Sequence, residues 1–257
     1  MATHFARGVL KDEHLLSERL SSTQHDVARQ LPLHRRHRYL ASRALLAELL
    51  FMLYGMGELP EITTTSNGKP TFKDIHLPHF SLAYAGNFVG VALTTEGECG
   101  LDMELRRVLR NSPQAAVLEN YRFTRNENLW INNQNDPNEA RMQITTLHQS
   151  VLKMSGDIHL GAPQSLQLLP SSGRLRFTHT DHLEVICDAE DILIWSLAVS
   201  PAMEKLKVWE FDGQYGWRSL PDTHMRTNTP SARLMKFTSL PAEKAALHHS
   251  LNGYTTS

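Results

Sequence analysis

Two carboxylates near residue 100 have a spacing that could hold a metal ion. The segment Glu98–Leu105 predicts a strand, and side chains two residues apart on a strand share a face, so Asp102 and Glu104 would point together. Such a pair repels unless a cation or several hydrogen-bond donors lie between the carboxylates. Mg²⁺ suits it, because this ion binds one or two protein carboxylates and completes its coordination with water and phosphate oxygens. An acidic edge solvated by water would show the same pattern, so both interpretations stay open here.

The residues before this strand predict a helix and a sheet that would position it. Apolar residues recur at three-to-four spacing from about His34 to Tyr54, and glycines follow that would end a helix. The N-terminal half of this helix is basic. The turn Ser66–Pro70 contains Asn-Gly and a proline, which mark a break in regular structure. The strands expected next are His79–Tyr84, Phe88–Thr95 and Glu98–Leu105, joined by short hairpin connections.

The second half of the chain repeats this layout loosely. A helix is expected from about Asn138 to Met154, where a Ser-Gly pair would end it. The asparagine-rich segment Asn126–Asn138 predicts a loop or a ragged helix end. The strands expected after the helix are Leu166–Leu169, Arg174–His179, Leu183–Asp188, Ile192–Ser200 and Leu206–Phe211.

A helix followed by strands in each half predicts an α/β (α+β) fold class with two similar halves. Each half would be a helix packed on a small, mostly antiparallel sheet. No sequence repeat of fixed period accompanies this similarity, so it is one of layout only. The expected domains are an N-terminal half, 1–107, a C-terminal half, 108–211, and a polar extension, 212–257, of unknown order. In the extension only Ala242–Leu251 has a weakly helical pattern.

The composition excludes several classes of protein. The 257 residues are 41% hydrophobic and 21% charged, which is typical of a globular chain. A net charge of −1 provides no attraction to nucleic acid or to an anionic membrane, so neither is expected as a partner. No apolar run is long enough to span a membrane, and Met1 to Asp12 lacks the layout of a secretory signal. With only Cys99 and Cys187 there is no disulfide framework, so we expect a reducing, cytoplasmic location.

Other motifs carry less information. Six histidines form pairs at metal-like spacings: His34 and His37, His76 and His79, and His179 and His182. No cysteine lies at zinc-finger spacing from them, so surface or core-packed histidines are the better explanation. The sequence has no G-x-S-x-G elbow, no Walker loop and no G-x-G-x-x-G turn.

Five elements with charged or glycine residues occur in a particular order along the chain. They are a basic helix containing Arg43, the turn Gly68-Lys69-Pro70, the strand Phe80–Tyr84, the strand with Asp102-x-Glu104, and the helix end Gln149-x-x-x-Lys153-Met154-Ser155-Gly156. This order resembles the 4′-phosphopantetheinyl transferases, specifically the larger monomeric type with two pseudo-symmetric halves. Their usual signature is G-K-P, then F-N/S-L-S-H-S, then G-(I/L/V)-D-(I/M)-E, and later W-x-x-K-E-x-x-x-K-x-x-G. The resemblance spans roughly residues 35–200 and is best over 68–107.

The resemblance implies a reaction and a set of partners. Enzymes of that family transfer the phosphopantetheine arm of coenzyme A to a serine of an acyl or peptidyl carrier protein, for example in fatty acid or polyketide biosynthesis. Coenzyme A would be the co-substrate, and a small acidic carrier protein would be the partner. By the resemblance, Asp102, Glu104 and Gln149 would hold Mg²⁺, which bridges the diphosphate of coenzyme A.

The resemblance also assigns roles to the basic residues. Lys153 would reach a phosphate oxygen, and Lys69 and Arg43 would bind phosphates at the nucleotide end. Taken alone, each has an ordinary explanation. Lys69 could be a solvated lysine beside a turn, and Arg43 could form an ion pair or lay its aliphatic part on apolar surface with its charge in water. Lys153 could stabilise the C-terminal end of the helix dipole. Their shared order with the acidic strand is what favours the binding roles.

The chain departs from the family pattern in two motifs. The family's Ser-His after the first strand is Ala83-Tyr84 here, and a tyrosine hydroxyl at the diphosphate contact carries no positive charge. The family's Lys-Glu is His148-Gln149, and Gln149 can offer Mg²⁺ a carbonyl oxygen but cannot accept the serine proton. His148 has a suitable intrinsic pKa for a base. However, one residue along a helix is about 100° around its axis, so His148 should point elsewhere.

Three hypotheses follow from the sequence. The first is a Mg²⁺-dependent transferase that is slow, because loss of the base lowers a rate on the order of 10²–10⁴-fold. The second is a catalytically impaired homologue that binds coenzyme A or a carrier protein without transfer. The third is an unrelated α/β protein whose match is accidental.

Overall fold

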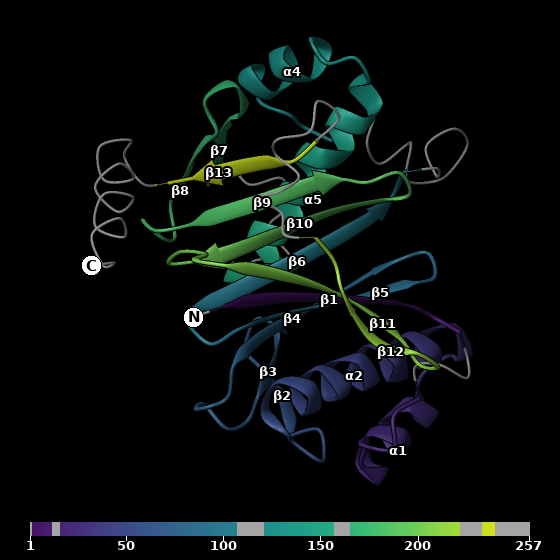
Figure 1. Cartoon of the computed structure of the whole chain (residues 1–257). Coiled ribbons are helices and arrows are strands. Elements are labelled where there is room, and N and C mark those ends of the chain that lie inside the picture. Colours follow the sequence, from purple (N-terminus) through teal and green to yellow (C-terminus); the bar gives the residue numbers. More distant parts are fainter. Residues whose placement is uncertain (1, 12–15, 107–120, 157–164, 222–232, 240–257) are drawn as a thin grey trace, which may run out of the picture.

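The chain folds into two main β-sheets that pack against each other, with one long helix on the outer face of each (Figure 1). The computed structural model describes residues 2–11, 16–106, 121–156, 165–221 and 233–239. Both sheets contain parallel and antiparallel pairs, and antiparallel pairs predominate. The expected α+β class is therefore confirmed.

The first sheet has the strand order β12-β11-β1-β5-β4. Its strands are β1 (Thr3–Val9), β4 (His79–Ala85), β5 (Phe88–Thr94), β11 (Leu206–Asp212) and β12 (Gly216–Ser219). The helix α2 (Leu33–Tyr54) covers this sheet, as its leucine spacing predicted, and buries Leu45, Leu46, Leu49 and Leu50 completely. Helix α1 (Ser22–Gln30) packs on α2, and the strands β2 (Ile62–Thr64) and β3 (Pro70–Phe72) form a separate hairpin.

The second sheet has the strand order β6-β10-β9-β13-β8-β7. Its strands are β6 (Glu98–Leu105), β7 (Leu166–Leu169), β8 (Arg174–Phe177), β9 (Glu184–Ala189), β10 (Leu193–Ser200) and β13 (Met235–Thr238). A short 3₁₀ turn, η3 (Pro170–Ser172), joins β7 to β8. The helix α5 (Pro137–Ser155) packs on β6, β9 and β10 and starts one residue before the position expected from the sequence.

The asparagine-rich segment was expected to be a loop or a ragged helix end, and most of it is helix. The helix α4 (Arg125–Asn132) begins at a capping box in which the Thr124 hydroxyl accepts from the Glu127 backbone N–H and the Glu127 side chain accepts from Thr124 N–H. Reciprocal capping satisfies backbone donors that a helix start otherwise leaves free. A good cap therefore outweighs the weak helix propensity of asparagine here.

The domain boundary expected at residue 107 does not separate the two sheets. β6, from the first half, pairs antiparallel with β10 of the second sheet, and β11, from the second half, pairs in parallel with β1 of the first. The sequence predicted no element at β1 or α1, although β1 is the central strand of its sheet. The extension is partly ordered into the sheets, since β12 and β13 belong to it. The helix expected at Ala242–Leu251 lies outside the described residues.

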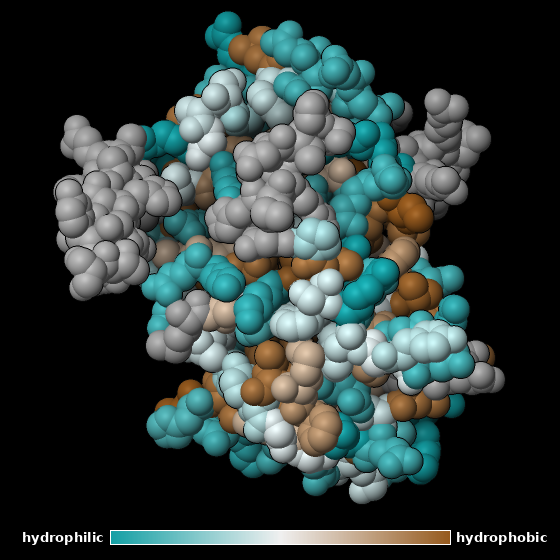
Figure 2. Space-filling model, in the orientation of Figure 1, coloured by the Kyte–Doolittle hydropathy of each residue, from teal (hydrophilic) through white to brown (hydrophobic). Residues whose placement is uncertain are grey.

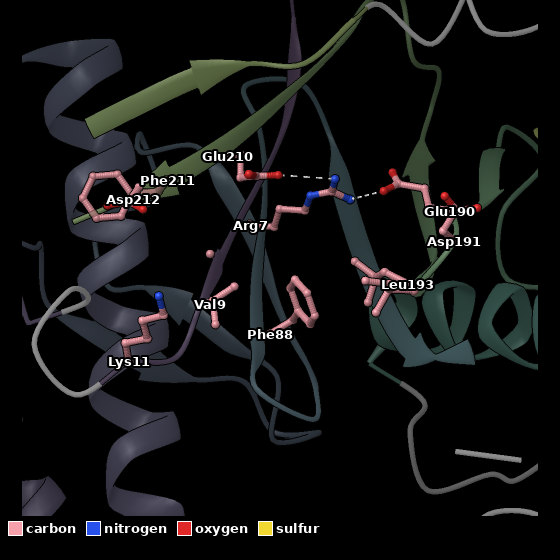
Figure 3. Close-up of a pocket in the computed structure, with 12 residues that line it drawn as sticks. Arg7, Val9, Lys11, Phe88, Glu190, Asp191, Leu193, Glu210, Phe211 and Asp212 are labelled. Carbon is pink, nitrogen blue, oxygen red and sulfur yellow. Dashed lines mark hydrogen bonds and ion pairs between the residues drawn. The ribbon is translucent and has the colours of Figure 1, made fainter. Parts of the chain in front are cut away.

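An apolar core fills the space between the sheets, and an arginine closes one end of it. Phe5 and Trp195 are fully buried there, with ring centroids 4.8 Å apart. At the rim, Arg7 of β1 donates to Glu190 across the sheets at 2.7 Å and lies 3.5 Å from Glu210 of its own sheet (Figure 3). Trp195 Nε1 donates to Glu190 at 3.0 Å. Arg7, Glu190 and Glu210 line a pocket of about 450 Å³. Because these three side chains pair with one another, we interpret their role as holding the two sheets together.

Three further observations concern membrane-spanning helices, the cysteines and the surface. Within the described ranges, no helix is long and apolar enough to cross a membrane. Both cysteines, Cys99 and Cys187, are free and buried. On the face drawn in Figure 2, hydrophilic side chains predominate at the end that carries α4, and hydrophobic ones appear in small separate groups.

Candidate active site

β6 and α5 bring the acidic pair next to a lysine. Lys153 Nζ donates to Asp102 Oδ1 at 2.7 Å. This close approach of helix and strand depends on Gly100, where a Cβ would lie only 2.0 Å from the carbonyl oxygen of Ser150. Asp102 is 9% exposed and Glu104 is half-buried on the same face, whereas the alternate residues of β6 point into the core between the sheets. The acidic pair is therefore held beside α5 and is not the fully solvated edge that remained open as an alternative.

Burial and mutual repulsion disfavour the charged forms of both carboxylates. Burial raises the pKa of Asp102, although the Lys153 ammonium opposes this shift. Burial, and then the charge of Asp102, raise the pKa of Glu104 to about 7. Lys153 is the only cation that ion-pairs with either of them among the described residues. Two carboxylates thus share one ammonium, which leaves an uncompensated negative charge when both are ionised.

This environment fits a divalent cation. Oxygen ligands from Asp102 and Glu104 are the kind that Mg²⁺ prefers, and a second positive charge beside Lys153 would remove the charge deficit. Gln149 precedes Lys153 by one turn of α5, so both side chains lie on one face of the helix. β6 and α5 run in opposite directions, so Asp102 lies beside this turn, where Lys153 bonds it, and Glu104 lies further along β6 toward Arg106, which pairs with Glu139 near the start of α5. The residues present therefore fit a magnesium site.

The histidine next to Gln149 turns toward a buried glutamate. His148 Nε2 lies 2.7 Å from Glu127 Oε1, and His148 Nδ1 lies 2.8 Å from the Tyr121 hydroxyl. Burial raises the pKa of Tyr121, and the nearby side chain of Gln149 opposes this shift. His148 and Glu127 are both almost completely buried. The sequence analysis did not identify Tyr121 or Glu127, although the Thr-x-x-Glu spacing of the capping box marks Glu127 as a structured residue.

Tyr84 and Arg43 meet at a serine of α2. The Tyr84 hydroxyl donates to Ser42 Oγ at 2.9 Å, and Arg43 Nη1 donates to the same oxygen at 3.0 Å. The Arg43 guanidinium also stacks 3.8 Å above the ring of Tyr39. Ser42 Oγ in turn donates to the Tyr39 carbonyl, so its hydrogen-bonding capacity is filled. Tyr84 is thereby tied to α2, the helix of the first sheet.

The strand with Tyr84 lies alongside the acidic strand. Leu101 N–H of β6 donates to Ser81 Oγ of β4 at 3.0 Å, and a Cβ at Gly86 would lie 2.3 Å from Leu105 Cδ1. β4 and β6 therefore run in the same direction, and residues that lie beside each other on the two strands differ by about 20 in residue number. Tyr84 is level with the end of β6 that carries Glu104, but its side chain packs toward α2 while the carboxylates face α5.

Lys69 of the Gly-Lys-Pro turn is buried at the other end of β6. Its ammonium contacts Glu98 and donates to the Met154 carbonyl at 2.9 Å, which connects the turn to the start of β6 and the end of α5. The hydrogen bond from His79 and the charge of Lys69 lower the pKa of Glu98 to about 2 despite its partial burial. Lys69 and neighbouring polar residues line a pocket of about 480 Å³ beside the C-terminus of α5.

The histidine pairs do not assemble a metal site. His79 contacts Glu98 at 3.1 Å, and the ring of His179 packs against Phe177. Among the residues that the structure describes, no three histidine, cysteine, aspartate or glutamate side chains gather as a metal cluster. The acidic pair is not such a cluster either, since its third oxygen ligand would be an amide.

Comparisons with known proteins connect the whole chain to one protein and a part of it to another. The chain is 60% identical over 245 residues to the uncharacterized protein YieE of Escherichia coli K12. The aligned residues make up 95% of this chain and 98% of YieE. The match to YieE of Escherichia coli O6:H1 has the same extent. A stretch of 77 residues is 39% identical to the 4′-phosphopantetheinyl transferase AcpT of Escherichia coli K12. This stretch makes up 30% of this chain and 36% of AcpT. No family model matches the chain.

Proposed function

The chain belongs to the family of the Escherichia coli protein YieE, and from this premise we propose that it is a Mg²⁺-dependent 4′-phosphopantetheinyl transferase. It would move the phosphopantetheine arm of coenzyme A to a serine of an acyl or peptidyl carrier protein. The observation that carries the proposal is the pair Asp102 and Glu104, two partly buried carboxylates that share one ammonium. The partial similarity to a protein of this name, and the order of motifs along the chain, support it.

Each residue of the acidic site has a separate role in this proposal. Asp102, Glu104 and the side-chain oxygen of Gln149 bind the ion. Mg²⁺, when bound, would neutralise charge on the diphosphate of coenzyme A. Lys153, whose ammonium here pairs with Asp102, would reach a phosphate oxygen of coenzyme A. Oriented charges of this kind stabilise the transition state without a large rearrangement.

The nucleotide end of coenzyme A would extend from the acidic site along the edges of β4 and β6. Arg43 is held by Ser42 and Tyr39 with its planar fork pre-oriented, which suits bidentate binding of a phosphate. Tyr84 contributes a hydroxyl in place of the histidine typical of the family. Lys69 supports the far end of the site, where its ammonium holds Glu98 and the end of α5. Two sheets, each with a long helix, support the two-half fold of the monomeric enzymes, and we propose action as a monomer.

A second candidate function is favoured by Gln149. An amide cannot take the proton of the serine that attacks, so the chain would bind coenzyme A or a carrier protein with little or no transfer. Gln149→Glu should raise transfer on the order of 10²-fold or more if the missing carboxylate is what limits the chemistry. The two candidates differ in the starting point: a slow transferase has a measurable rate before the change, and a protein that only binds has none.

Calorimetric titration of coenzyme A into the protein, with Mg²⁺ and then with chelator, tests the site. Magnesium-dependent binding that Asp102→Ala abolishes and Glu96→Gln leaves intact is the expected result; Glu96 is an exposed carboxylate on the neighbouring hairpin. A panel of apo carrier proteins, with the mass gain of the carrier as readout, then distinguishes transfer from binding alone. If the protein binds neither coenzyme A nor any carrier protein of the panel, both candidates are wrong.

A further inference from the structure

We propose that Glu98 and Lys69 form a positioning pair that holds the last turn of α5, so that Lys153 on this turn stays beside Asp102. Neither member of the pair would touch coenzyme A. The proposal rests on the proposed function, because the place of Lys153 matters only if its ammonium reaches a phosphate oxygen of coenzyme A. It gives Lys69 a role that differs from the phosphate contact implied by the resemblance, and it assigns a role to Glu98, which the sequence analysis did not identify.

The ammonium of Lys69 is committed to acceptors of the protein itself. It contacts the Glu98 carboxylate and donates to the Met154 carbonyl oxygen at 2.9 Å. Only 11% of the Lys69 side chain is exposed, compared with 47% of the Glu98 side chain. A phosphate that took this ammonium would leave the buried Met154 carbonyl or the carboxylate without its donor, which costs free energy. The position of Lys69 therefore favours a contact within the protein over a contact with a ligand.

The Met154 carbonyl belongs to the part of α5 that needs a partner from outside the helix. The last four carbonyl groups of a helix accept no bond from within it. Gly156 ends α5 in the left-handed conformation, with φ of 82°, and its N–H donates to the Leu152 carbonyl. The Met154 carbonyl accepts from Lys69 instead, which also places a positive charge at the negative end of the helix dipole. Lys69 therefore fixes the last turn by a hydrogen bond and by its charge.

This turn carries the lysine that meets the acidic pair. Glu98 and Asp102 are four residues apart on β6, and side chains at even spacing along a strand face the same side, here toward α5. Lys153 directly precedes Met154 and donates to Asp102 at 2.7 Å. The end of α5 is therefore attached to this face of β6 at two points, by the pair of Lys153 with Asp102 and by Lys69, which contacts Glu98. Loss of the second attachment frees the turn from which Lys153 extends.

Glu98 is a stable anchor for the ammonium. The hydrogen bond from His79 lowers the pKa of Glu98 to about 2, and the hydrogen bond and charge of Lys69 act in the same direction, although burial opposes them. The carboxylate is therefore ionised at neutral pH. His79 begins β4 and lies 3.1 Å from Glu98, so the anchor also connects the first strands of the two sheet edges that meet here.

Calorimetric titration of coenzyme A in the presence of Mg²⁺ tests the proposal through the sign of one effect. If Lys69 bound a phosphate, Glu98→Ala would release its ammonium and strengthen the binding of coenzyme A. If the pair positions Lys153, Glu98→Ala should weaken this binding about threefold or more, and Lys69→Met should weaken it about 10-fold. Lys73→Met is the matched control, since Lys73 is an exposed lysine that follows β3 and pairs with Glu61, and it should leave the affinity unchanged. Thermal unfolding of each variant shows whether a loss of affinity reflects loss of folded protein.

A second background separates positioning from direct contact. Lys153→Met removes the ammonium that the pair positions, so adding Lys69→Met to it should lower the affinity for coenzyme A by less than about threefold. Lys69→Met alone should weaken the binding of dephospho-coenzyme A, which lacks the 3′-phosphate, as much as that of coenzyme A.

Three results would overturn the positioning pair while leaving the proposed function intact. They are tighter binding by Glu98→Ala, equal losses from Lys69→Met with and without Lys153, and a loss confined to coenzyme A and absent with dephospho-coenzyme A. If the unmodified protein binds no coenzyme A, the coenzyme A site itself is wrong and the pair falls with it.

Discussion

Glu104 lies in an environment that is unfavourable to its own charge. It neighbours Asp102 on one face of β6 and has no ion-pair partner within the described residues, since Lys153 bonds Asp102. Groups held in such environments are typical of sites that act on a charged ligand, because stability is given up where function needs a particular charge. We therefore expect substitution of Glu104 to affect stability and metal binding in opposite directions.

We predict that Glu104→Gln stabilises the metal-free protein at high pH and abolishes its binding of Mg²⁺. The pKa of Glu104 is raised from 4.5 to about 7, so the stability contributed by this group is present below pH 4.5 and is lost as the pH rises through about 7. The variant avoids that loss, so its free energy of unfolding should exceed that of the unmodified protein by about 1–3 kcal/mol at pH 8. Urea unfolding at pH 4.5 and pH 8 measures the difference, which should be near zero at the lower pH. A variant that is less stable at pH 8 would contradict the account of this residue.

At the scale of elements, the site depends on how closely α5 approaches β6. Gly100 provides that approach, since the carbonyl oxygen of Ser150 and the backbone nitrogen of Met154 would lie 2.0 and 2.4 Å from a Cβ there. The obstructing atoms are backbone and cannot rotate away. Any larger residue must push the helix off the strand and with it Lys153, whose partner Asp102 lies two residues along β6.

We predict that Gly100→Ala lowers the free energy of unfolding by about 3 kcal/mol and weakens coenzyme A binding together with it. Gly57→Ala is the control, because nothing lies within 4 Å of a Cβ at that position and it should be nearly neutral. Urea unfolding and the calorimetric titration described above provide the two readouts. Full stability in Gly100→Ala would show that α5 and β6 are not in the tight contact described.

At the scale of the whole molecule, Arg7 connects the two sheets at the end of their shared core. Its guanidinium bridges Glu210 of its own sheet and Glu190 of the other, and its side chain is 10% exposed (Figure 3). Glu190 also accepts from Trp195, the largest residue of the core between the sheets. Loss of Arg7 leaves Glu190 and Glu210, whose side chains are 21% and 37% exposed, without this cation.

We predict that Arg7→Met lowers the free energy of unfolding by about 1–3 kcal/mol, because its two carboxylate partners stay partly exposed to water. Adding Glu190→Gln should recover part of the loss, because the glutamine is neutral and its oxygen still accepts from Trp195 Nε1. Lys73→Met, which breaks an exposed pair with Glu61, is the control and should change stability by less than about 0.5 kcal/mol. Chemical unfolding of the three variants measures these values. Equal effects of Arg7→Met and Lys73→Met would refute the role of Arg7.

Much of the local structure could be predicted from the sequence. The helices α2 and α5 and the strands β4, β5 and β6 lie within a few residues of their expected positions, because apolar periodicity and glycine stops are local signals. The shared face of Asp102 and Glu104 follows from strand geometry alone. The central strand β1 was not predicted, since His4 and Arg7 interrupt its apolar pattern. Their partners, Trp209 for His4 and Glu190 and Glu210 for Arg7, are distant in the chain.

What the sequence determined by itself is the set of elements and the residue types on their faces, because a repeat of two or 3.6 residues places side chains without reference to the rest of the chain. Only the tertiary structure decided which elements meet. It joined β11 to β1 and β6 to β10 across the expected boundary, buried Lys69 against Glu98, and brought Tyr121 and Glu127 to His148 beside Gln149. These contacts depend on how two sheets bury their common apolar face, and no local pattern encodes that choice.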